Sequence, residues 1–351
     1  MLSPRTETIL KSIVGKYITR ATPVPSQSIS SDSELGVSAA TIRNEMAYLE
    51  QEGYITRPHT SSGSVPSDKG YRCYVESLGD VHLPLNEQRL INHLFHQVEK
   101  ELDEWTNLAT TLIAQMVQNA AIITIPKPPA CQLKHLELVG LQDFLALIIL
   151  VLSGARLRQQ LIAFDQITSQ EELTPIANRL TTAYAGMTAA QILKRDQDLT
   201  PFEQQVTGCI TSVMEAEDEE EHEVHYLDGL HFVLNQPEFT HNQRLALNLM
   251  ELIEQRNLLK SIRPPDLSSD EVQVIIGTEN RSDDIHDYSV VIAKYGLPEE
   301  AVGTIGVIGP TRMPYARTIA TVSYLASILS ELEARLYGKE IQARMKNEST
   351  N

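Results

Sequence analysis

The segment from Ser38 to Gly63, SAATIRNEMAYLEQEGYITRPHTSSG, restricts the fold of this chain more than any other stretch. Ser38 is a favourable N-cap for a helix that extends to about Glu52, and the glycine after Glu52 suits the left-handed conformation that ends a helix. Residues 54–56 are aromatic and β-branched, a turn-forming cluster follows, and an extended segment resumes at Val65. A helix, a tight turn and a short hairpin in this order predict a reading helix with a wing beside it.

Two more helices are predicted ahead of this segment. Ser3 and Pro4 form a helix start, with serine as the N-cap and proline at the first helical position. The apolar residues that follow repeat at helical spacing, and they are Ile9, Leu10, Ile13, Val14 and Tyr17. Ser26 can cap a short second helix that ends near Leu35. Together the three helices make a helix-turn-helix core, and a fourth helix is expected in residues 67–78.

The net charge argues against a nucleic-acid partner only when it is averaged over the whole chain. The sequence has 29 Lys and Arg against 46 Asp and Glu, a formal net charge of −17. Residues 1–80 contain three Lys and five Arg against nine Asp and Glu, a net charge of −1, so the other 271 residues carry −16. Seven of the nine residues in EAEDEEEHE, Glu215–Glu223, are acidic, and we expect a solvated loop or helix face there. The acidity therefore lies mainly outside the predicted reading helix and wing.

The length and composition are those of a globular protein with two or three domains. The N-terminus lacks a basic stretch followed by an apolar run, so we expect no signal peptide. The longest apolar run, Leu145–Leu152, is well short of the roughly 20 residues that cross a bilayer. Three dispersed cysteines, Cys73, Cys131 and Cys209, favour a reducing compartment and structural thiols over disulfides or a zinc site. We expect a cytoplasmic protein without a cofactor or a metal.

Beyond a boundary near residues 79–84, predicted helices and strands are mixed. Residues 86–118 have an apolar helical repeat and predict one long amphipathic helix. Strands are predicted at Leu133–Leu141, Leu145–Leu152, Leu157–Phe164, Val224–Leu227, Val272–Ile276, Ser289–Ala293 and Gly303–Ile308. Helices are predicted at Gln170–Thr188, Pro201–Met214, Arg244–Leu259 and Pro314–Tyr337, before a polar tail. Strands on both sides of a helical interval predict an α+β domain that carries an insertion.

The stretches LSPRTETIL, VPSQSIS, VSAATIRNEMAYLEQEGYI, RPHTSSG and VPSDKGYRCYVESL together resemble HrcA, the heat-inducible transcription repressor family. The stretches LNQPEF (Leu234–Phe239), VIIGTEN (Val274–Asn280) and GTIGVIGPTRMPYAR (Gly303–Arg317) agree with this resemblance. It covers nearly the whole chain and rests on the combination of motifs, since no single one is specific. It implies an α+β multidomain protein with an N-terminal winged helix-turn-helix, a GAF-like α/β domain and a dimerisation domain inserted in the latter.

On this resemblance the domains are expected as a winged-helix domain at 1–80, a GAF-like domain at 85–165 and 241–340, a dimerisation domain at 166–240 and a disordered tail at 341–351. The resemblance also implies a homodimeric repressor of chaperone operons of the groE and dnaK type. Its operator would be an inverted repeat in double-stranded DNA, a CIRCE-type element. The GroE chaperonin would maintain its activity, and heat stress would release the operator when chaperonin is titrated away.

The predicted reading helix can be divided into two faces. At 100° per residue its apolar residues fall within about 60° of one another, and they are Ile42, Met46 and Leu49. The opposite side holds the candidate DNA contacts Asn44 and Tyr48 with two alanines and a glutamine, and Thr41 and Arg43 lie beside it. Asparagine can pair with adenine, and arginine with guanine or phosphate. Ser38 lies at the helix N-terminus, which favours a phosphate. The alternative is that Arg43 and Asn44 are ordinary surface residues.

The predicted wing adds polar side chains that suit phosphate and minor-groove contacts, although an ordinary polar hairpin has the same composition. The candidate residues are Arg57, His59, Thr60 and Ser62. Lys69 and Arg72 can contact the DNA backbone or form local ion pairs, and the sequence leaves both roles open. Members of the family that this chain resembles often have arginine after the wing glycine, where this chain has Ser64. Serine can donate a hydrogen bond to a phosphate but brings no charge.

Three other patterns have a chemical interpretation beside a structural one. The HxxH at 222–225 could recruit a metal, but its spacing is not that of HExxH, and solvated charge is favoured. Gly303, Gly306 and Gly309 fit a strand with its turn better than a dinucleotide fingerprint. Residues 310–313 could hold a small anion or have a structural role. No Ser-His-Asp or Cys-His pairing is apparent, so we do not expect an enzyme.

The sequence therefore favours a dimeric DNA-binding repressor of heat-shock operons, whose two reading helices would meet an inverted repeat. A second class is a small-molecule-responsive regulator, in which the GAF-like domain binds an effector that releases DNA. A third class is an interaction protein that uses the winged helix for protein contacts. Operator binding that strengthens with chaperonin, without a thermal shift by metabolites, favours the first class over the second. Failure to shift an inverted-repeat duplex at low salt would point to the third.

Overall fold

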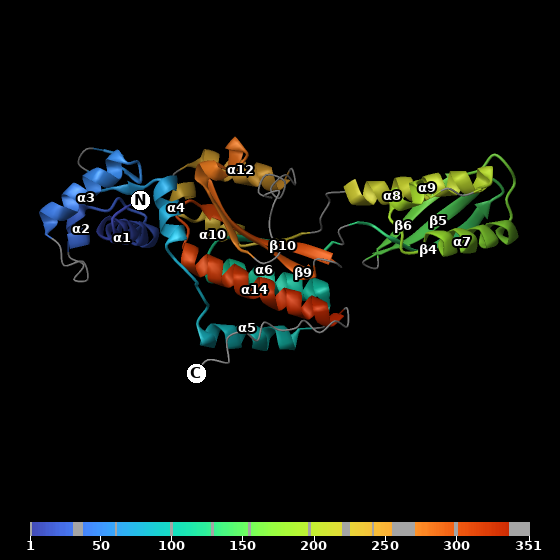
Figure 1. Cartoon of the computed structure of the whole chain (residues 1–351), viewed down its shortest axis with the longest axis horizontal. Coiled ribbons are helices and arrows are strands. Elements are labelled where there is room, and N and C mark those ends of the chain that lie inside the picture. Colours follow the sequence, from blue (N-terminus) through green and yellow to red (C-terminus); the bar gives the residue numbers. More distant parts are fainter. Residues whose placement is uncertain are drawn as a thin grey trace. The chain divides into compact units, whose positions relative to one another are not determined.

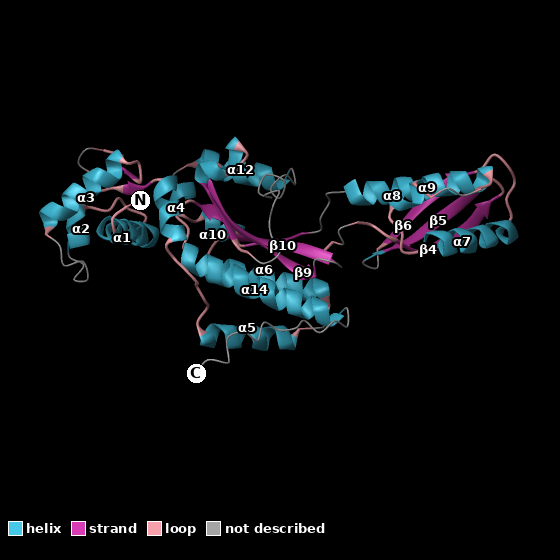
Figure 2. Ribbon diagram, in the orientation of Figure 1, coloured by secondary structure: helices cyan, strands magenta, loops and turns pink. Residues whose placement is uncertain are grey.

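The computed structural model describes residues 2–30, 38–59, 62–98, 101–127, 130–153, 156–195, 198–219, 225–240, 242–254, 271–297 and 301–336. The chain forms two compact units, whose elements are shown in Figures 1 and 2. Unit 1 comprises Met1–Ile125, His225–Gly296 and Gly303–Asn351. Unit 2 comprises Pro126–Val224 and Leu297–Val302.

Unit 1 begins with three helices around a small core. They are α1 (Pro4–Arg20), α2 (Ser26–Ser30) and α3 (Ala39–Gln51). Ser3 caps α1 as predicted, because its hydroxyl accepts a hydrogen bond from the Thr6 N–H at 3.2 Å. The apolar positions of the three helices are buried, and they are Ile9, Leu10, Ile13, Val14, Ile29, Ile42, Met46 and Leu49. The rest of the predicted second helix, residues 31–37, lies outside the described residues.

A hairpin and a fourth helix complete this part of the unit. They are β1 (Ile55–Thr56), β2 (Val65–Pro66) and α4 (Asp68–Glu76). Gly53 has a φ of +76° where α3 leads into the hairpin, the left-handed conformation that the sequence predicts. β1 and β2 pair antiparallel, and Ser64 exchanges two backbone hydrogen bonds with Val24 in the α1–α2 connection. We refer to residues 2–76, with α1 to α4 and the hairpin, as the N-terminal head.

The rest of unit 1 is built on a five-stranded sheet of order β7-β3-β10-β9-β8. Its strands are β3 (Ala120–Thr124), β7 (His225–Asp228), β8 (Gln273–Ile276), β9 (Tyr288–Leu297) and β10 (Ala301–Pro310). β3 pairs antiparallel with both β10 and β7, and β8 pairs antiparallel with β9. The central strands carry buried apolar side chains on both faces, so the sheet separates two cores.

Helices cover both faces of this sheet. They are α5 (Leu85–Gln97), α6 (Leu102–Val117), α10 (Leu230–Leu234), α11 (Pro237–Thr240), α12 (Gln243–Glu254) and α14 (Tyr315–Leu336), with short 3₁₀ turns η2 (Gly277–Glu279) and η3 (Asp283–Ile285). α6 and α14 lie side by side and share a core with Ile123, Val291 and Ile305 (Figure 1). α12 shares the other core with Ile122 and Val290.

Two glycines of β10 make room for neighbouring side chains. A Cβ at Gly303 would lie 2.5 Å from the Tyr295 ring, and one at Gly309 would lie 2.1 Å from the Asn119 amide oxygen. The Tyr295 hydroxyl donates a hydrogen bond to the Thr124 carbonyl at 2.6 Å, which holds that ring in place. The GxxGxxG pattern therefore belongs to a strand, and the structural interpretation of it is confirmed.

Unit 2 is a three-stranded antiparallel sheet with helices on one face. Its strands are β4 (Leu133–Gln142), β5 (Leu145–Leu152) and β6 (Leu157–Ala163) in the order β4-β5-β6, and its helices are α7 (Gln170–Tyr184), α8 (Ala189–Leu193) and α9 (Pro201–Glu219). Every second residue of β5, beginning with Ala146, is buried against the helices. The intervening residues of β5 are half-buried, although they are aliphatic too.

One predicted element is wrong, because residues 86–118 form two helices and not one. α5 ends at Gln97, the next residue is extended with a ψ of 157°, and α6 begins only after another extended residue, Glu101. The predicted apolar stripe advances mostly in steps of four residues, and each such step moves it about 40° around a helix. A stripe that drifts in this way cannot stay on one face. Leu90 is accordingly 58% exposed, while Trp105 on α6 is buried.

The acidic segment Glu215–Glu223 was expected to be solvated, and this expectation is wrong for Glu217. α9 continues past Met214, and Glu217 is only 3% exposed. The Glu217 carboxylate lies 2.7 Å from Nη1 of Arg156 and 2.5 Å from Nε of Arg158. Glu217 comes three residues after the buried Met214 and shares its helix face, where the two guanidinium groups neutralise it. Residues 220–223 lie outside the described part of the chain.

The compact units divide the chain at other residues than the domains expected from sequence. Residues 133–163, expected in the GAF-like domain, form the sheet of unit 2. Residues 225–240, expected in the insertion, belong to unit 1 because β7 pairs with β3. The first assignment follows pairing between consecutive strands, and the second follows pairing between strands distant in sequence. The expected tail at 341–351 lies outside the ranges that the structure describes.

Among the described residues, Glu333 on α14 is a buried carboxyl group without a charged neighbour to compensate it. It is 1% exposed, and within the described residues its Oε2 atom has no hydrogen-bond partner. Burial raises the pKa of Glu333 to about 8, because desolvation disfavours the charged form.

We predict that Glu333→Gln removes a pH-dependent loss of stability. Because the folded state holds this proton more tightly than the unfolded state, the free energy of unfolding falls as the pH rises from about 4.5 to about 8. The slope is at most about 1.4 kcal/mol per pH unit. Denaturant unfolding should show Glu333→Gln more stable than the wild type at pH 8 but similar to it at pH 5. Glu331→Gln, an exposed neighbour, is the control, and identical pH dependence in all three proteins would refute the prediction.

Candidate nucleic-acid interface

α3 presents the predicted reading residues on its solvent side. Ser38 caps the helix by accepting a hydrogen bond from the Thr41 N–H at 3.2 Å. Arg43 and Asn44 are exposed, and their side chains make no hydrogen bond or ion pair with any other described residue. Tyr48 is 44% exposed. The division of the helix into an apolar and a polar face is confirmed, and the polar face carries groups that can donate and accept hydrogen bonds.

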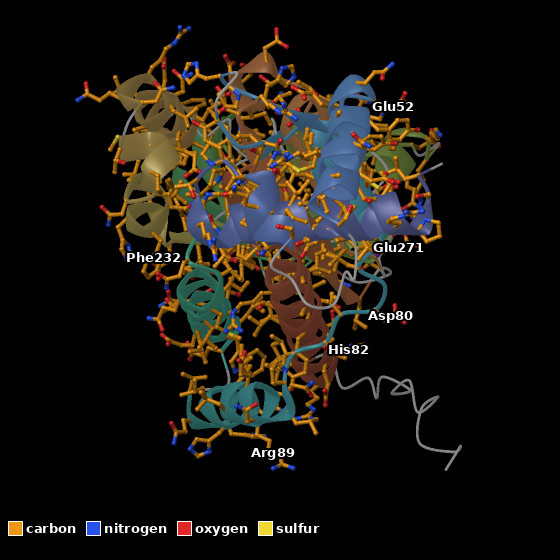
Figure 3. All side chains as sticks on the ribbon, turned by 90° about the vertical axis from the view of Figure 1, so that its left-hand side faces the viewer. Glu52, Asp80, His82, Arg89, Phe232 and Glu271 are labelled. Atoms are coloured by element: carbon orange, nitrogen blue, oxygen red, sulfur yellow. The ribbon has the colours of Figure 1, made fainter. Side chains whose placement is uncertain are left out.

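The reading helix is tied to the start of α1 on its inner side. Glu45 accepts a hydrogen bond from the Thr6 hydroxyl at 2.8 Å, and its other carboxylate oxygen lies 3.9 Å from Nε of Arg5. Figure 3 views the unit from the side of the N-terminal head, with Glu52, the C-cap of α3, labelled. The polar face of α3 is therefore carried on a helix whose other side is fixed.

The hairpin places further predicted residues next to α3. Nε of Arg57 lies 3.2 Å from a carboxylate oxygen of Glu50, with the two side chains 36% and 37% exposed. Exposed pairs of this kind contribute about 0–1 kcal/mol, so Arg57 can exchange Glu50 for a phosphate. The Ser62 hydroxyl accepts a hydrogen bond from the His59 N–H at 3.0 Å and donates one to the His59 carbonyl at 2.7 Å. Ser62 thus closes the hairpin tip, and Thr60 lies outside the described residues.

Lys69 is engaged within the head. Its Nζ donates a hydrogen bond to the Glu52 carbonyl at 2.8 Å and lies 4.2 Å from the centroid of the Tyr54 ring. That carbonyl is one of those left without a partner at a helix C-terminus, where a positive charge is favourable. Of the two roles that the sequence leaves open for Lys69, the structure shows the local one.

Arg72 forms a local ion pair with Glu279, so it is not a free basic group. Its Nε donates to Oε1 of Glu279 at 2.7 Å, its Nη2 also contacts the second oxygen of that carboxylate, and Nη2 donates to the Val274 carbonyl at 2.6 Å. The guanidinium therefore attaches α4 to β8 and η2. A role of Arg72 in DNA contact would require that these bonds open.

Four residues with a role in placing the reading helix were missed by sequence reasoning. They are Asp68, Glu238, Glu279 and Arg312. Nε of Arg312 donates to Glu238 at 2.6 Å, and its Nη1 donates to the Ile18 carbonyl at 2.7 Å. Arg312 is neutralised in this way, so of the two roles that the sequence leaves open for residues 310–313 the structural one is observed. The motifs that carry the family resemblance contain all four residues, but no local pattern in them indicates their partners.

The expectation that Ser64 can reach a phosphate is wrong. Ser64 is fully buried, since its backbone pairs with Val24 and turns the side chain inward. Its Oγ has no hydrogen-bond partner among the described residues. The wing therefore offers neither a charge nor an available hydroxyl at this position.

The described part of the chain gives no support to a metal site, a reactive cysteine or a membrane-spanning helix. No three His, Cys, Asp or Glu side chains gather there in a way that could hold a metal ion, and His222 lies outside it. Burial raises the pKa of the Cys131 thiol to about 11, which keeps it protonated at neutral pH. None of the described helices combines the length and hydropathy needed to cross a membrane.

Comparison with known proteins gives one consistent result. Residues 103–319 match the family "HrcA protein C terminal domain". The chain is 54% identical over 339 residues to the heat-inducible transcription repressor HrcA of Dehalococcoides mccartyi strain 195, which spans 97% of this chain and 98% of the relative. It is 39% identical over 346 residues to the protein of the same name from Herpetosiphon aurantiacus, with coverage of 96% and 97%.

A solved structure described only as a hypothetical protein has a similar fold. It superposes with a TM-score of 0.57 at 22% sequence identity and covers 95% of this chain and 98% of its own. The likeness concerns the fold alone.

We predict that Ser64→Ala leaves DNA binding unchanged and does not lower stability. The substitution removes a buried hydroxyl without a described partner, which should raise the free energy of unfolding by up to about 1 kcal/mol. Ser62→Ala is the control, because it removes two hydrogen bonds at the hairpin tip and should cost about 0.5–1.5 kcal/mol. Denaturant unfolding and duplex titration measure both effects. A weaker duplex affinity of Ser64→Ala at normal stability would mean that its hydroxyl does reach DNA.

Proposed function

The chain belongs to the HrcA family of heat-inducible transcription repressors, and we propose that it acts as a dimer that binds an inverted-repeat operator of heat-shock chaperone operons. Negative regulation of heat-shock transcription is the function of the family. The operator type, the reading residues and the partners are our proposal. The observation that carries it is the polar face of α3, where Arg43 and Asn44 are exposed and unengaged among the described residues.

We interpret the N-terminal head as a winged helix-turn-helix and the five-stranded sheet with its helices as a GAF-like domain. The order of α1, α2, α3 and the hairpin supports the first interpretation, because the hairpin follows the reading helix and packs beside it. A sheet with α6 and α14 on one face and α12 on the other supports the second.

In this proposal α3 enters the major groove. The groove is about 12 Å wide and admits one helix, and the exposed Ala40 and Ala47 allow close approach. Asn44 can pair with an adenine edge and Arg43 with guanine or a phosphate. Ser38 and the N-terminal turn of α3 would face a phosphate, together with Thr41 and Tyr48 along the helix. Arg57, His59, Thr60 and Ser62 would follow the DNA backbone from the wing. Lys69 and Arg72 would support the head instead of contacting DNA.

The acidity of the chain does not oppose this docking. Residues 1–80 carry a net charge of −1, against −17 for the whole sequence. Charges farther than a Debye length, about 8 Å at physiological salt, act weakly across water, so the local groups at the docking face decide. A dimer doubles the number of these groups on one DNA molecule.

The outer face of the unit 2 sheet is the surface through which we expect two copies to pair. It is mostly aliphatic over two adjacent strands, with Leu145, Leu147, Ile149 and Val151 on β5 and Leu157 and Leu161, on either side of Gln159, on β6. Leu157 is 51% exposed and Leu161 is 57% exposed. A sheet that is apolar on both faces is normally covered on both, and exposed patches of this kind mark interaction sites. A second copy fits best, since an inverted repeat requires a two-fold symmetric dimer.

The same surface supports the proposed dependence on the GroE chaperonin. An unpaired chain exposes aliphatic surface, which is the kind of surface that chaperones recognise. Chaperonin that is occupied by heat-damaged proteins would then leave fewer repressor dimers on the operator. The proposal involves no catalysis and no cofactor, and it places the protein in the cytoplasm with the DNA.

We predict that Arg43→Ala and Asn44→Ala each weaken operator binding by about 1–3 kcal/mol, roughly fivefold to more than a hundredfold, because each removes a base contact. The measurement is a titration of the inverted-repeat duplex found upstream of the chaperonin operon in the same genome, with and without chaperonin. Arg335→Ala, at an exposed arginine near the end of α14, is the matched control and should bind as the wild type does. Unchanged affinity in both α3 variants would rule out this reading face.

We predict that Leu161→Glu dissociates the dimer, because it places a charge in an apolar interface. Sedimentation equilibrium should show a monomer, and affinity for the inverted repeat should fall while affinity for a single half-site stays the same. Leu247→Glu is the control, since Leu247 is 64% exposed on α12 of unit 1 and lies outside the sheet face. Dimers in both variants would exclude this surface as the interface.

A further inference from the structure

Three separate attachments join the N-terminal head to the rest of unit 1. The first lies at the start of α4. Asp68 accepts hydrogen bonds from the N–H of Thr278 at 3.0 Å and from the hydroxyl of Thr278 at 2.9 Å. One turn later, Arg72 donates hydrogen bonds to the Glu279 carboxylate and to the Val274 carbonyl. Gly277 has a φ of +53°, and a Cβ there would lie 2.3 Å from an Asp68 carboxylate oxygen. The η2 turn is therefore shaped around the Asp68 carboxylate.

The second attachment lies at the end of α1. Ile18 is in the last turn of that helix, where carbonyl groups have no partner within the helix and carry partial negative charge. The Arg312 guanidinium donates to the Ile18 carbonyl at 2.7 Å while Glu238 holds it from the other side at 2.6 Å. Arg312 is 13% exposed, so water competes little with these bonds.

The third attachment is a buried contact between aromatic rings. The Tyr71 and Tyr315 rings have centroids 5.8 Å apart, and both side chains are buried. Tyr315 is fixed in turn, because its hydroxyl donates to the Thr311 carbonyl at 2.6 Å and lies 2.7 Å from the Ser289 hydroxyl. A single attachment would allow the head to rotate relative to the rest of unit 1, whereas three attachments at different places resist both rotation and tilt.

The attachments reach the reading helix through short connections. The Ser67 hydroxyl, directly before α4, donates to the Gly53 carbonyl at 2.6 Å, and Lys69 on α4 donates to the Glu52 carbonyl. Both acceptors directly follow α3. At the other side, Glu45 of α3 accepts the hydrogen bond from Thr6 of α1. The C-terminal end of α3 is tied to α4 and its middle to α1, and both of those helices are attached to the rest of unit 1.

We propose that the two carboxylates Glu279 and Glu238 are positioning residues that set which separation of operator half-sites the repressor accepts. They act through Arg72 and Arg312, which hold α3 in one direction relative to the five-stranded sheet. The inference rests on the proposed function, because a separation exists only for a dimer on two half-sites. Each base pair added between half-sites moves the second by about 3.4 Å and rotates it by about 34°. A head that is fixed within unit 1 follows that change less readily than a loosened head does.

The test is the double variant Glu279→Gln/Glu238→Gln, which leaves every residue of the head intact. Duplexes selected from a random library with the wild-type protein are rebuilt with the spacer lengthened or shortened by one to three base pairs, and a single half-site duplex is included. The wild type should lose affinity about tenfold or more when the spacer changes. In the double variant this loss should shrink to about threefold or less, with single half-site affinity unchanged. Glu331→Gln, which removes an ion pair on the same unit away from the head, should behave as the wild type does.

The outcomes separate the possible roles of the two carboxylates. Equal spacer dependence in the wild type and the double variant overturns the proposal. A drop in affinity by one common factor on every duplex, single half-sites included, also overturns it, since that is the result of damage to the head alone. If the double variant does not fold by circular dichroism, the single variants Glu279→Gln and Glu238→Gln each weaken one attachment and must show an intermediate spacer dependence. Absence of any duplex binding by the wild type would refute the proposed function itself, and not the positioning role.

Discussion

Burial of the interior strands β9 and β10 on both faces is the constraint on which the rest of unit 1 depends. Val291 of β9 and Ile305 of β10 pack into the core with α6 and α14, while Val290 and Ile308 pack into the core with α12. Each face thus requires its own layer of helices, and the sheet edge at β8 remains for the N-terminal head. Glu279 and the Val274 carbonyl, which hold Arg72, lie at that edge. The direction of the reading helix is in this sense a consequence of how the sheet is packed.

The chain has two apolar surfaces with different roles. One is buried on both faces of the five-stranded sheet in unit 1, and the N-terminal head is attached at the edge of that sheet. The other, on β5 and β6 of unit 2, is mostly aliphatic and is left uncovered by the described residues of one chain. In the proposed function, specific DNA recognition by a chain with a net charge of −17 would rest on geometry and pairing more than on general attraction to phosphate.

Sequence reasoning succeeded where local pattern alone decides structure. The faces of α3 follow from helical spacing, and the strands β5 and β6 follow from aliphatic runs between turns. It failed where distant contacts decide. β3 went unrecognised because AAIIT is short and apolar throughout, without the alternation that marks a strand. Ser64 and Glu217 have polar side chains, yet pairing with Val24 and with two arginines buries them. The candidate contacts Lys69 and Arg72 were identified as basic residues, but Arg72 meets Glu279 across 207 residues and Arg312 meets Ile18 across 294. No local motif can indicate partners at such distances.

The most direct test of the account is a chemical protection map of the operator in complex with the wild-type protein. Methylation protection at guanine N7 reports major-groove contact base by base. The account predicts two protected major-groove tracts, related by a two-fold axis and lying on one side of the duplex at a fixed separation. A single tract, protection confined to the minor groove, or no protection at saturating protein would contradict the claim that two fixed α3 helices read the inverted repeat.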